Sequence, residues 1–252
     1  MHRPARLMIF AFCLSAAGHV LADDGWQPGI TVAPYGWLVT VGGDVGAVHP
    51  AGSPAPGSSL EVTLNDDYDD GGAMLYVDWR GDRWMTFLDT VWIHASQSGD
   101  ASPPVFATTR IEARIDAVTV QGAVGYRVAE WDRTSLVAFG GLRYYDITLD
   151  LDASGGVLAD PLSTDGSDDW VDGLVGLRLE TSLGERWRAS VMTDVGKGGS
   201  DAAWQVLGSI AYGFSWGSVV AGYRHLDLDY SNGNFAADID LSGPMLGVAF
   251  SF

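Results

Sequence analysis

The residues best placed to do chemistry are a histidine and two aspartates near the C-terminus. His225 lies two and four residues before Asp227 and Asp229, so an extended strand would carry all three on one face. A histidine beside carboxylates can activate water as a general base, and the acidic residues at 66–70 could supply opposing carboxylates. A structural histidine, hydrogen-bonded to its neighbours, explains the same residues. We favour that reading and expect no enzyme.

Other chemical sites are weaker. Residues 196–200 contain glycines and a lysine, but they lack the strand, loop and helix of a phosphate-binding loop. No cluster of histidines suits zinc. The acidic stretches at 66–70 and 165–169 could hold calcium but do not follow an EF-hand spacing, and solvated acidic loops explain them better. We expect neither a metal nor a cofactor.

The N-terminus is typical of a secretory signal peptide. Arg3 and Arg6 precede an apolar run at 7–17, and small residues precede Asp23. The run has about half of the ~20 residues that a membrane-spanning helix needs. We therefore expect residues 1–22 to be cleaved and 23–252 to form one exported domain. The single cysteine, Cys13, lies in the leader, which excludes a disulfide framework and thiolate catalysis.

Composition points to an unusual surface. The formal net charge of −18 argues against a nucleic-acid partner. Yet 47% of the residues are hydrophobic, and the chain has 33 glycines and 10 tryptophans. Both facts fit a membrane barrel with apolar residues outside and charges in its lumen and loops. A secreted β-sandwich, the soluble alternative, would need little aromatic excess.

Alternating polarity predicts ten strands along the chain. They lie near residues 28–42, 70–80, 84–97, 108–128, 134–150, 170–182, 187–197, 201–214, 216–230 and 238–252. A further short strand at 59–64 keeps the range at eight to twelve.

The connections alternate between short and long. Tight turns are expected at 80–83, 129–133, 183–186 and 215, and the longer loops include 43–69, 98–107 and 151–169. Tryptophans flank the short turns, as aromatic residues do at a membrane interface. They are Trp79, Trp84, Trp131, Trp187 and Trp216. The prediction is an all-β, up-and-down antiparallel transmembrane barrel of about ten strands, with both termini in the periplasm.

Charges alternate with apolar residues on the fourth to sixth strands, and we expect them to face the lumen. The predicted ladder between strands four and five consists of Arg110, Glu112, Arg114, Asp116, Asp146, Asp150 and Asp152. Asp172 and Glu180 are expected to be lumen carboxylates on strand six. The preferred register places Arg110 opposite Asp152, Arg114 opposite Thr148 and Asp116 opposite Asp146, with a slip of two residues as the alternative.

Two arginines do not fit this phase. Arg143 and Arg224 fall among the apolar positions of their strands. A β-bulge at the neighbouring Gly141 and Gly222 would repair the phase, and another bulge is expected at Gly243–Pro244.

The last strand resembles the terminal strand of outer-membrane proteins. Its apolar residues alternate up to the final residue, so Phe250 and Phe252 are expected to form the signal that the barrel assembly machinery recognises.

The chain also resembles a family of uncharacterised proteobacterial outer-membrane β-barrel proteins. The similar segments are 33–37 (Ala-Pro-Tyr-Gly-Trp), 194–196 (Asp-Val-Gly), 199–201, 204–205 (Trp-Gln), 222–224 (Gly-Tyr-Arg), 226–227 and 229–230. The resemblance implies fold and location, and it brings no activity or functional residue. Within the chain, residues 141–147 echo residues 222–228, which we interpret as reuse of a hairpin pattern.

The expected function is that of an integral outer-membrane barrel with a narrow acidic lumen. It would be a structural envelope protein or a small pore that favours cations, since a ten-stranded lumen is largely filled by side chains. A surface-loop binder of an ion or partner is the alternative, and an omptin-like rim protease using His225 and Asp227 is a remote one. The expected partners are outer-membrane lipid, lipopolysaccharide and, during insertion, the barrel assembly machinery.

Overall fold

The computed structural model describes residues 26–47, 62–63, 71–101, 109–155, 162–232 and 235–252. These residues form twelve strands: β1 (Gly29–Trp37), β2 (Thr40–Ala47), β3 (Val62–Thr63), β4 (Gly71–Arg80), β5 (Trp84–Ala101), β6 (Thr109–Trp131), β7 (Thr134–Gly155), β8 (Leu162–Ser182), β9 (Trp187–Gly198), β10 (Ala202–Phe214), β11 (Gly217–Asn232) and β12 (Phe235–Ser251). None of the described residues forms a helix long and apolar enough to span a membrane.

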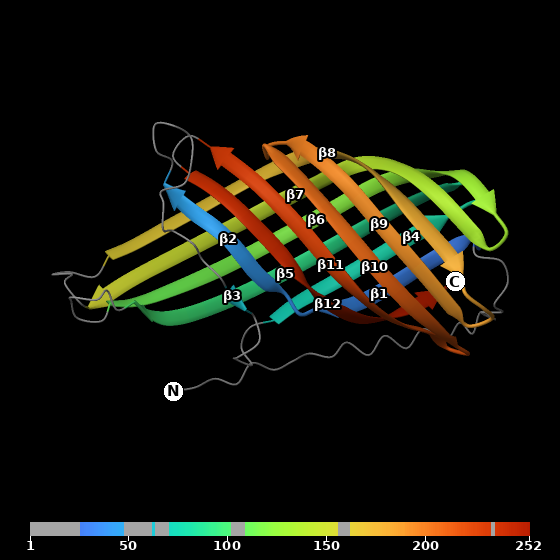
Figure 1. The fold of residues 1–252 in the computed structure, drawn as a ribbon, viewed down its shortest axis with the longest axis horizontal. Helices are drawn as coiled ribbons and strands as arrows, with labels where there is room; N and C mark the ends of the chain where they lie inside the picture. Colours follow the sequence, from blue (N-terminus) through green and yellow to red (C-terminus); the bar gives the residue numbers. More distant parts are fainter. Residues whose placement is uncertain (1–25, 48–61, 64–70, 102–108, 156–161, 233–234) are drawn as a thin grey trace.

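Ten of these strands close into an antiparallel barrel (Figure 1). β1 pairs with both β4 and β12, which closes the ring that β4 to β12 form in chain order. β2 continues β1 after a break at Leu38 and Val39 and pairs with the first half of β12. The short β3 pairs with β2 through two residues. The predicted fold class and the count of ten are confirmed, with β1 and the start of β2 covering the first predicted strand.

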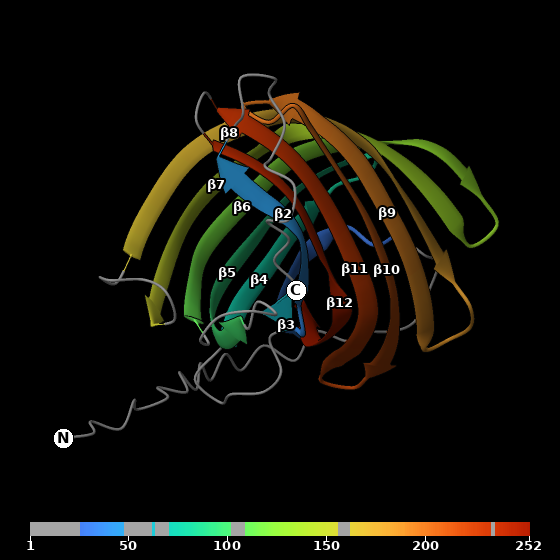
Figure 2. The same ribbon diagram turned by 60° about the vertical axis from the view of Figure 1, so that its left-hand side comes forward.

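Four short connections lie at one end of the barrel, here called the turn end. They are residues 81–83, 132–133, 183–186 and 215–216. β1 begins there, because Gly29 pairs with Arg80 beside the first turn, and β12 ends there, because Phe252 exchanges backbone hydrogen bonds with Ile30. The five tryptophans predicted to flank these turns are all exposed, between 47% and 54%. At the opposite end, β5 to β8 are the longest strands and extend beyond their neighbours (Figures 1 and 2).

The outer wall carries an apolar band with a defined upper edge. Near mid-height it exposes Leu142 and Val175, at 60% and 63%. Farther from the turn end, the outward positions of β7 and β8 become acidic at Asp146 and Asp169. On β5 the change falls between Trp92 and His94. The band therefore ends at a similar level on neighbouring strands.

The interior is apolar at this upper level. Around and beyond the level where the outer wall becomes charged, the inward side chains form apolar clusters. One cluster contains Trp37, Val39, Met74, Val91, Ile93 and Leu226, and a second contains Tyr145, Trp170, Ala203, Leu228 and Tyr230. Along one strand, the outward side chains are thus apolar within the band, and the inward side chains are apolar above it. The inward and outward alternation itself continues without interruption.

This inversion overturns the predicted lumen ladder. Ala117 and Ile147 pack against the interior clusters, so the adjacent Asp116 and Asp146 point outward. The same alternation places Arg114 and Asp150 on the outer wall, where charges meet water. The side chains of Arg110, Glu112 and Asp152 lie outside the described part of the structure.

The register of β6 and β7 also differs from the preferred prediction. Arg114 lies opposite Asp150, Asp116 opposite Thr148 and Arg110 opposite Ser154, a shift of two residues that corresponds to the stated alternative. Two local features produce it: the turn contains only Asp132 and Arg133, and a bulge interrupts β6 at 127–129. Asp132 adopts a φ of 51°, which aspartate tolerates better than most residues.

The three bulges predicted at glycines are wrong. Pairing runs without a shift past Gly141, Gly222 and Gly243. Arg143 and Arg224 are interior residues in the regular phase, so no repair is needed. These glycines instead allow close approach of backbones: a Cβ on Gly243 would lie 1.8 Å from the Leu38 carbonyl oxygen. The Trp37 indole also donates to the Gly243 carbonyl, at 3.2 Å.

We expect Gly243→Ala to destabilise the barrel by at least about 2 kcal/mol, because the β1–β2 break must move away from β12. Gly208→Ala is the matched control, since a Cβ on this mid-strand glycine meets nothing within 4 Å. Urea unfolding followed by tryptophan fluorescence measures both. Equal midpoints for the two variants would contradict the close approach.

Candidate functional site

A polar network crosses the barrel interior near mid-height. This central network consists of Tyr35, Asp89, Gln121, Arg143, Asp194, Gln205 and Arg224. Each residue comes from a different strand: β1, β5, β6, β7, β9, β10 and β11. The two glutamines and the two arginines are at most 1% exposed.

One half of the network surrounds Arg224. Its Nη1 donates to Asp89 Oδ2 at 2.9 Å and to the Tyr35 hydroxyl at 3.1 Å. Its Nε and Nη2 donate to Gln205 Oε1 at 3.1 and 2.9 Å. The Tyr35 hydroxyl donates in turn to Asp89 Oδ1 at 2.7 Å, and the guanidinium lies 5.1 Å from the centre of the Trp37 ring. Every nitrogen of this buried cation therefore has a partner.

The other half surrounds Arg143 in a similar way. Nη2 donates to Asp194 Oδ1 at 2.6 Å and to Gln121 Oε1 at 2.8 Å, and Nε donates to Gln121 Oε1 at 3.2 Å. Nη1 donates to the Tyr145 hydroxyl at 3.3 Å. Gln205 Nε2 donates to Gln121 Oε1 at 2.9 Å and also to Asp194, which joins the two halves.

A second polar group, the lower cluster, lies nearer the turn end. It contains Tyr76, Asp78 and Arg80 from β4 and Arg178 and Glu180 from β8. Arg80 forms a bidentate pair with Glu180, at 2.7 and 3.0 Å, and a bond of 2.9 Å to Asp78. Because β5 to β7 separate β4 from β8 in the sheet, this pair also spans the interior.

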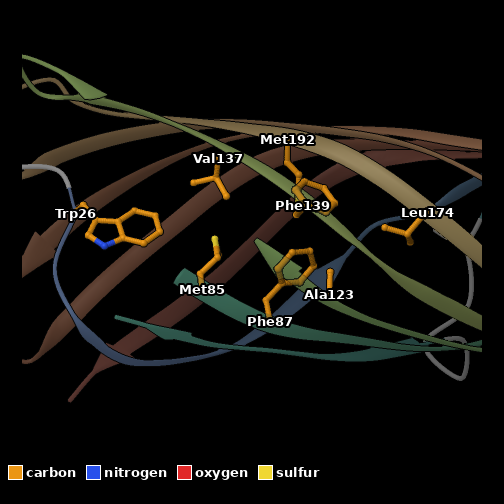
Figure 3. Packing of buried hydrophobic residues seen from close by; sticks show 8 residues of the cluster. All are labelled: Trp26, Met85, Phe87, Ala123, Val137, Phe139, Leu174 and Met192. Carbon is orange, nitrogen blue, oxygen red and sulfur yellow. The ribbon is translucent and has the colours of Figure 1, made fainter. Parts of the chain in front are cut away.

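An apolar layer extends from the turn end past the lower cluster toward the central network. It is formed by Trp26, Met85, Phe87, Ala123, Val137, Phe139, Leu174 and Met192. Figure 3 shows the rings of Phe87 and Phe139 near its centre, in an edge-to-face contact of 5.3 Å between centroids. Trp26 lies at the turn end, where its indole donates to the Gly81 carbonyl at 2.7 Å and its ring faces Arg80 and Arg127.

Two cavities of the described interior lie on opposite sides of the central network. The lower cavity, about 160 Å³, reaches from Arg188, Ser218 and Ser251 near the turn end to Tyr35 and Asp89. The upper cavity, about 50 Å³, is mostly apolar and lies on the other side of the central network, against Arg224 and Trp37. The central network thus separates them.

Asp172 and Glu180 both lie inside the barrel, at 1% and 2% exposure. Asp172 accepts hydrogen bonds from the backbone and the hydroxyl of Ser200, and Glu180 pairs with Arg80 and Arg178. The sequence predicts an acidic lumen, but the described interior is not acidic. Its other buried carboxylates also pair with arginines: Asp78 with Arg80, Asp89 with Arg224, and Asp194 with Arg143.

His225 and Asp227 lie on the outer wall, because Arg224 and Leu226 point into the lumen and the residues between and after them point outward. The His225 ring contacts Trp204, with centroids 4.8 Å apart. Neither residue lines a described cavity, and residues 66–70, the expected opposing carboxylates, lie outside the described residues. Within the described ranges, no three histidine, aspartate or glutamate side chains gather where they could hold a metal ion.

Phe250 and Phe252 lie on the outer wall beside the turn end. Phe250 is half-buried, with its ring 6.0 Å from that of Trp216, and Phe252 is exposed. Both residues lie where β12 meets β1, at the seam that closes the ring. Their role in assembly stays a prediction.

Sequence reasoning did not select the central network, although signals for it were present. Arg143 and Arg224 stood out as charges in an apolar phase. The segments that carry the family resemblance contain Tyr35, Asp194, Gln205 and Arg224. These segments are far apart in the sequence, and the closed barrel brings their side chains together.

A scan of family models and a search of curated proteins find no match to this chain. Solved structures do match its fold. The translocator domain of the autotransporter NalP from Neisseria meningitidis is 14% identical, with 92% of this chain and 91% of that chain covered and a TM-score of 0.51. The outer-membrane protease OmpT from Escherichia coli is 10% identical, with 89% and 97% covered and a TM-score of 0.54. At these identities the similarity shows the fold of outer-membrane barrels and no shared activity.

We expect Arg224→Met to destabilise the barrel by about 3 to 5 kcal/mol, because it leaves Asp89 buried without its cation. The double variant Asp89→Leu/Arg224→Met should cost less than the two single variants together, since neither charge is left alone. Urea unfolding of all three variants measures this coupling.

His94→Ala is the control, because His94 and Asp116 pair on the outer wall with about half of each side chain exposed. We expect a change below about 1 kcal/mol there. Strictly additive losses at Asp89 and Arg224 would contradict a coupled network.

Proposed function

We propose that this protein is an outer-membrane barrel that is closed to solutes and has a structural role in the envelope. The observation that carries this proposal is the central network, whose arginines and glutamines cross the interior almost without exposure to solvent. The apolar layer and the lower cluster fill part of the interior on the turn-end side of this network, beside the lower cavity. A small ten-stranded barrel is expected to be filled in this way.

The pairing of the buried carboxylates argues against the alternative of a cation-favouring pore. A pore that selects cations needs carboxylates facing a path for ions, whereas Asp89, Asp194 and Glu180 each face an arginine. The outer-wall position of His225 and Asp227 likewise gives a rim hydrolase no support, so the proposed role is non-enzymatic.

The apolar band supports residence in the outer membrane. Exposed aromatic residues at the turn end and the apolar wall above them have the arrangement of a lipid-facing surface. The turn end would face the periplasm, and the charged wall of β5 to β8 would rise into the extracellular layer of lipopolysaccharide.

In planar bilayers we expect the wild-type protein to give no conductance steps. Asp89→Ser/Arg224→Ser removes one ion pair from the central network and joins the two cavities, so small, brief steps are expected. The control His94→Ser/Asp116→Ser removes an exposed pair and should stay silent. Regular conductance steps from the wild-type protein would overturn the proposal. If their reversal potential showed selectivity for cations, the alternative of a cation-favouring pore would be supported.

The membrane position of the band predicts a difference between two arginine substitutions. Val175→Arg places a charge at mid-band and should cost about 2 to 4 kcal/mol in lipid vesicles. Asp146→Arg, above the band, should change the stability by less than about 0.5 kcal/mol. Urea unfolding in vesicles compares them, and equal costs would argue against lipid contact at Val175.

A further inference from the structure

We propose that the lower cavity binds a small carboxylate with an apolar body, about the size of benzoate, that enters from the turn end. This inference goes beyond the proposed structural role, because a closed barrel could have that role whether or not it binds such a ligand.

One of the arginines that line this cavity is not paired with a carboxylate of the described residues. Arg80, Arg178 and Arg188 line it together with Asp78 and Glu180. Arg80 and Arg178 are paired with the two carboxylates, and Asp89 at the inner end is paired with Arg224. Arg188 is exposed, and the carboxylates of Glu180 and Asp78, which pair with Arg80 and Arg178, attract it only from beyond ion-pair distance. Its guanidinium is therefore available to an anion.

One guanidinium nitrogen of Arg178, which also lines this cavity, is unsatisfied. The Nε of Arg178 is buried and has no hydrogen-bond partner among the described residues. A buried donor without a partner carries a desolvation penalty that an acceptor would remove. Carboxylate oxygens are strong acceptors for guanidinium groups, so the same anion that pairs with Arg188 has a chemical reason to approach Arg178.

Much of the cavity wall formed by β9 to β12 is apolar. It includes Met192, Leu207, Val220 and Met245, beside the hydroxyl groups of Ser190, Ser209 and Ser218. An apolar lining with a few convergent polar groups is typical of a small-molecule site. A ligand that combines a charged end with an apolar body therefore fits better than a free inorganic anion, which would leave this wall without a contact.

The size of the cavity limits the ligand. A cavity of about 160 Å³ is comparable to the ~150 Å³ apolar cavity that accommodates benzene in an engineered protein. A long acyl chain would need to pass the central network. Benzoate and short-chain carboxylates meet both the charge and the volume.

The test uses 4-fluorobenzoate and fluorine NMR on the folded, full-length protein in detergent micelles. We expect saturable binding to the wild-type protein. Arg188→Gln should weaken it at least tenfold, and Arg188→Lys should recover part of the affinity. The neutral 4-fluorobenzyl alcohol should bind at least tenfold more weakly than the carboxylate, because it cannot pair with Arg188.

Arg186→Gln is the matched control. Arg186 lies in the adjacent turn, is exposed and donates to the Tyr212 hydroxyl at 3.5 Å, a hydrogen bond that raises the pKa of its guanidinium. Arg186→Gln and Arg188→Gln remove the same charge from the same end of the barrel. The probe should therefore partition equally into the micelles of both variants. We expect binding within twofold of wild type.

Val220→Phe tests the apolar wall, because a larger side chain there fills the cavity without a change of charge. It should weaken binding at least fivefold, with heat-modifiable gel mobility showing that the variant is folded. No saturable binding to the wild-type protein, equal binding to Arg188→Gln, or equal binding of the neutral alcohol would each overturn the inference. None of these results depends on conductance, so they leave the structural role to its own experiment.

Discussion

The burial of two guanidinium groups is the constraint on which the rest of this barrel depends. An arginine side chain stays charged in a protein, and a charge away from water must be fully paired. Arg143 and Arg224 obtain their partners from strands that are distant in the chain, among them Asp194 on β9 and Asp89 on β5. A slip of one residue on any of these strands would turn a partner outward. The network therefore fixes the register of most of the barrel and excludes water from its middle.

The alternation of side chains could be predicted from the sequence, but the environment of each face could not. Strand periodicity and turn residues are local, so the ten strands, the short turns and the flanking tryptophans follow from short windows. Whether an alternating charge lies inside or outside depends on what surrounds the barrel at that height. Leu142 and Asp146 share one face of β7, yet the first lies in the apolar band and the second lies beyond it. Without knowledge of the band, the charged face above it was assigned to the lumen.

The two arginines also explain the internal echo between residues 141–147 and 222–228. The third residue of each segment is the buried arginine, and in each case a glutamine from the preceding strand accepts two of its hydrogen bonds. Gln121 lies directly opposite Arg143, whereas Gln205 lies two residues from the position opposite Arg224. Two similar hairpins thus build two similar halves of one network. The sequence shows the repeated arginine, but a glutamine on another strand leaves no local pattern to find.

The same network limits what the lower cavity can do. A ligand that enters from the turn end meets Asp89 and Tyr35 at the inner end of the cavity, and both are hydrogen-bonded to Arg224. Passage to the upper cavity requires these bonds to open and leaves a buried charge unpaired, at a cost of about 3 to 5 kcal/mol. Since 1.4 kcal/mol corresponds to a factor of ten, such an opening is populated in about one molecule in a hundred to one in a few thousand. The upper cavity, about 50 Å³, offers little room beyond that point. The geometry thus makes the lower cavity a place where a small ligand stays and leaves by the end at which it entered, and not a section of a channel.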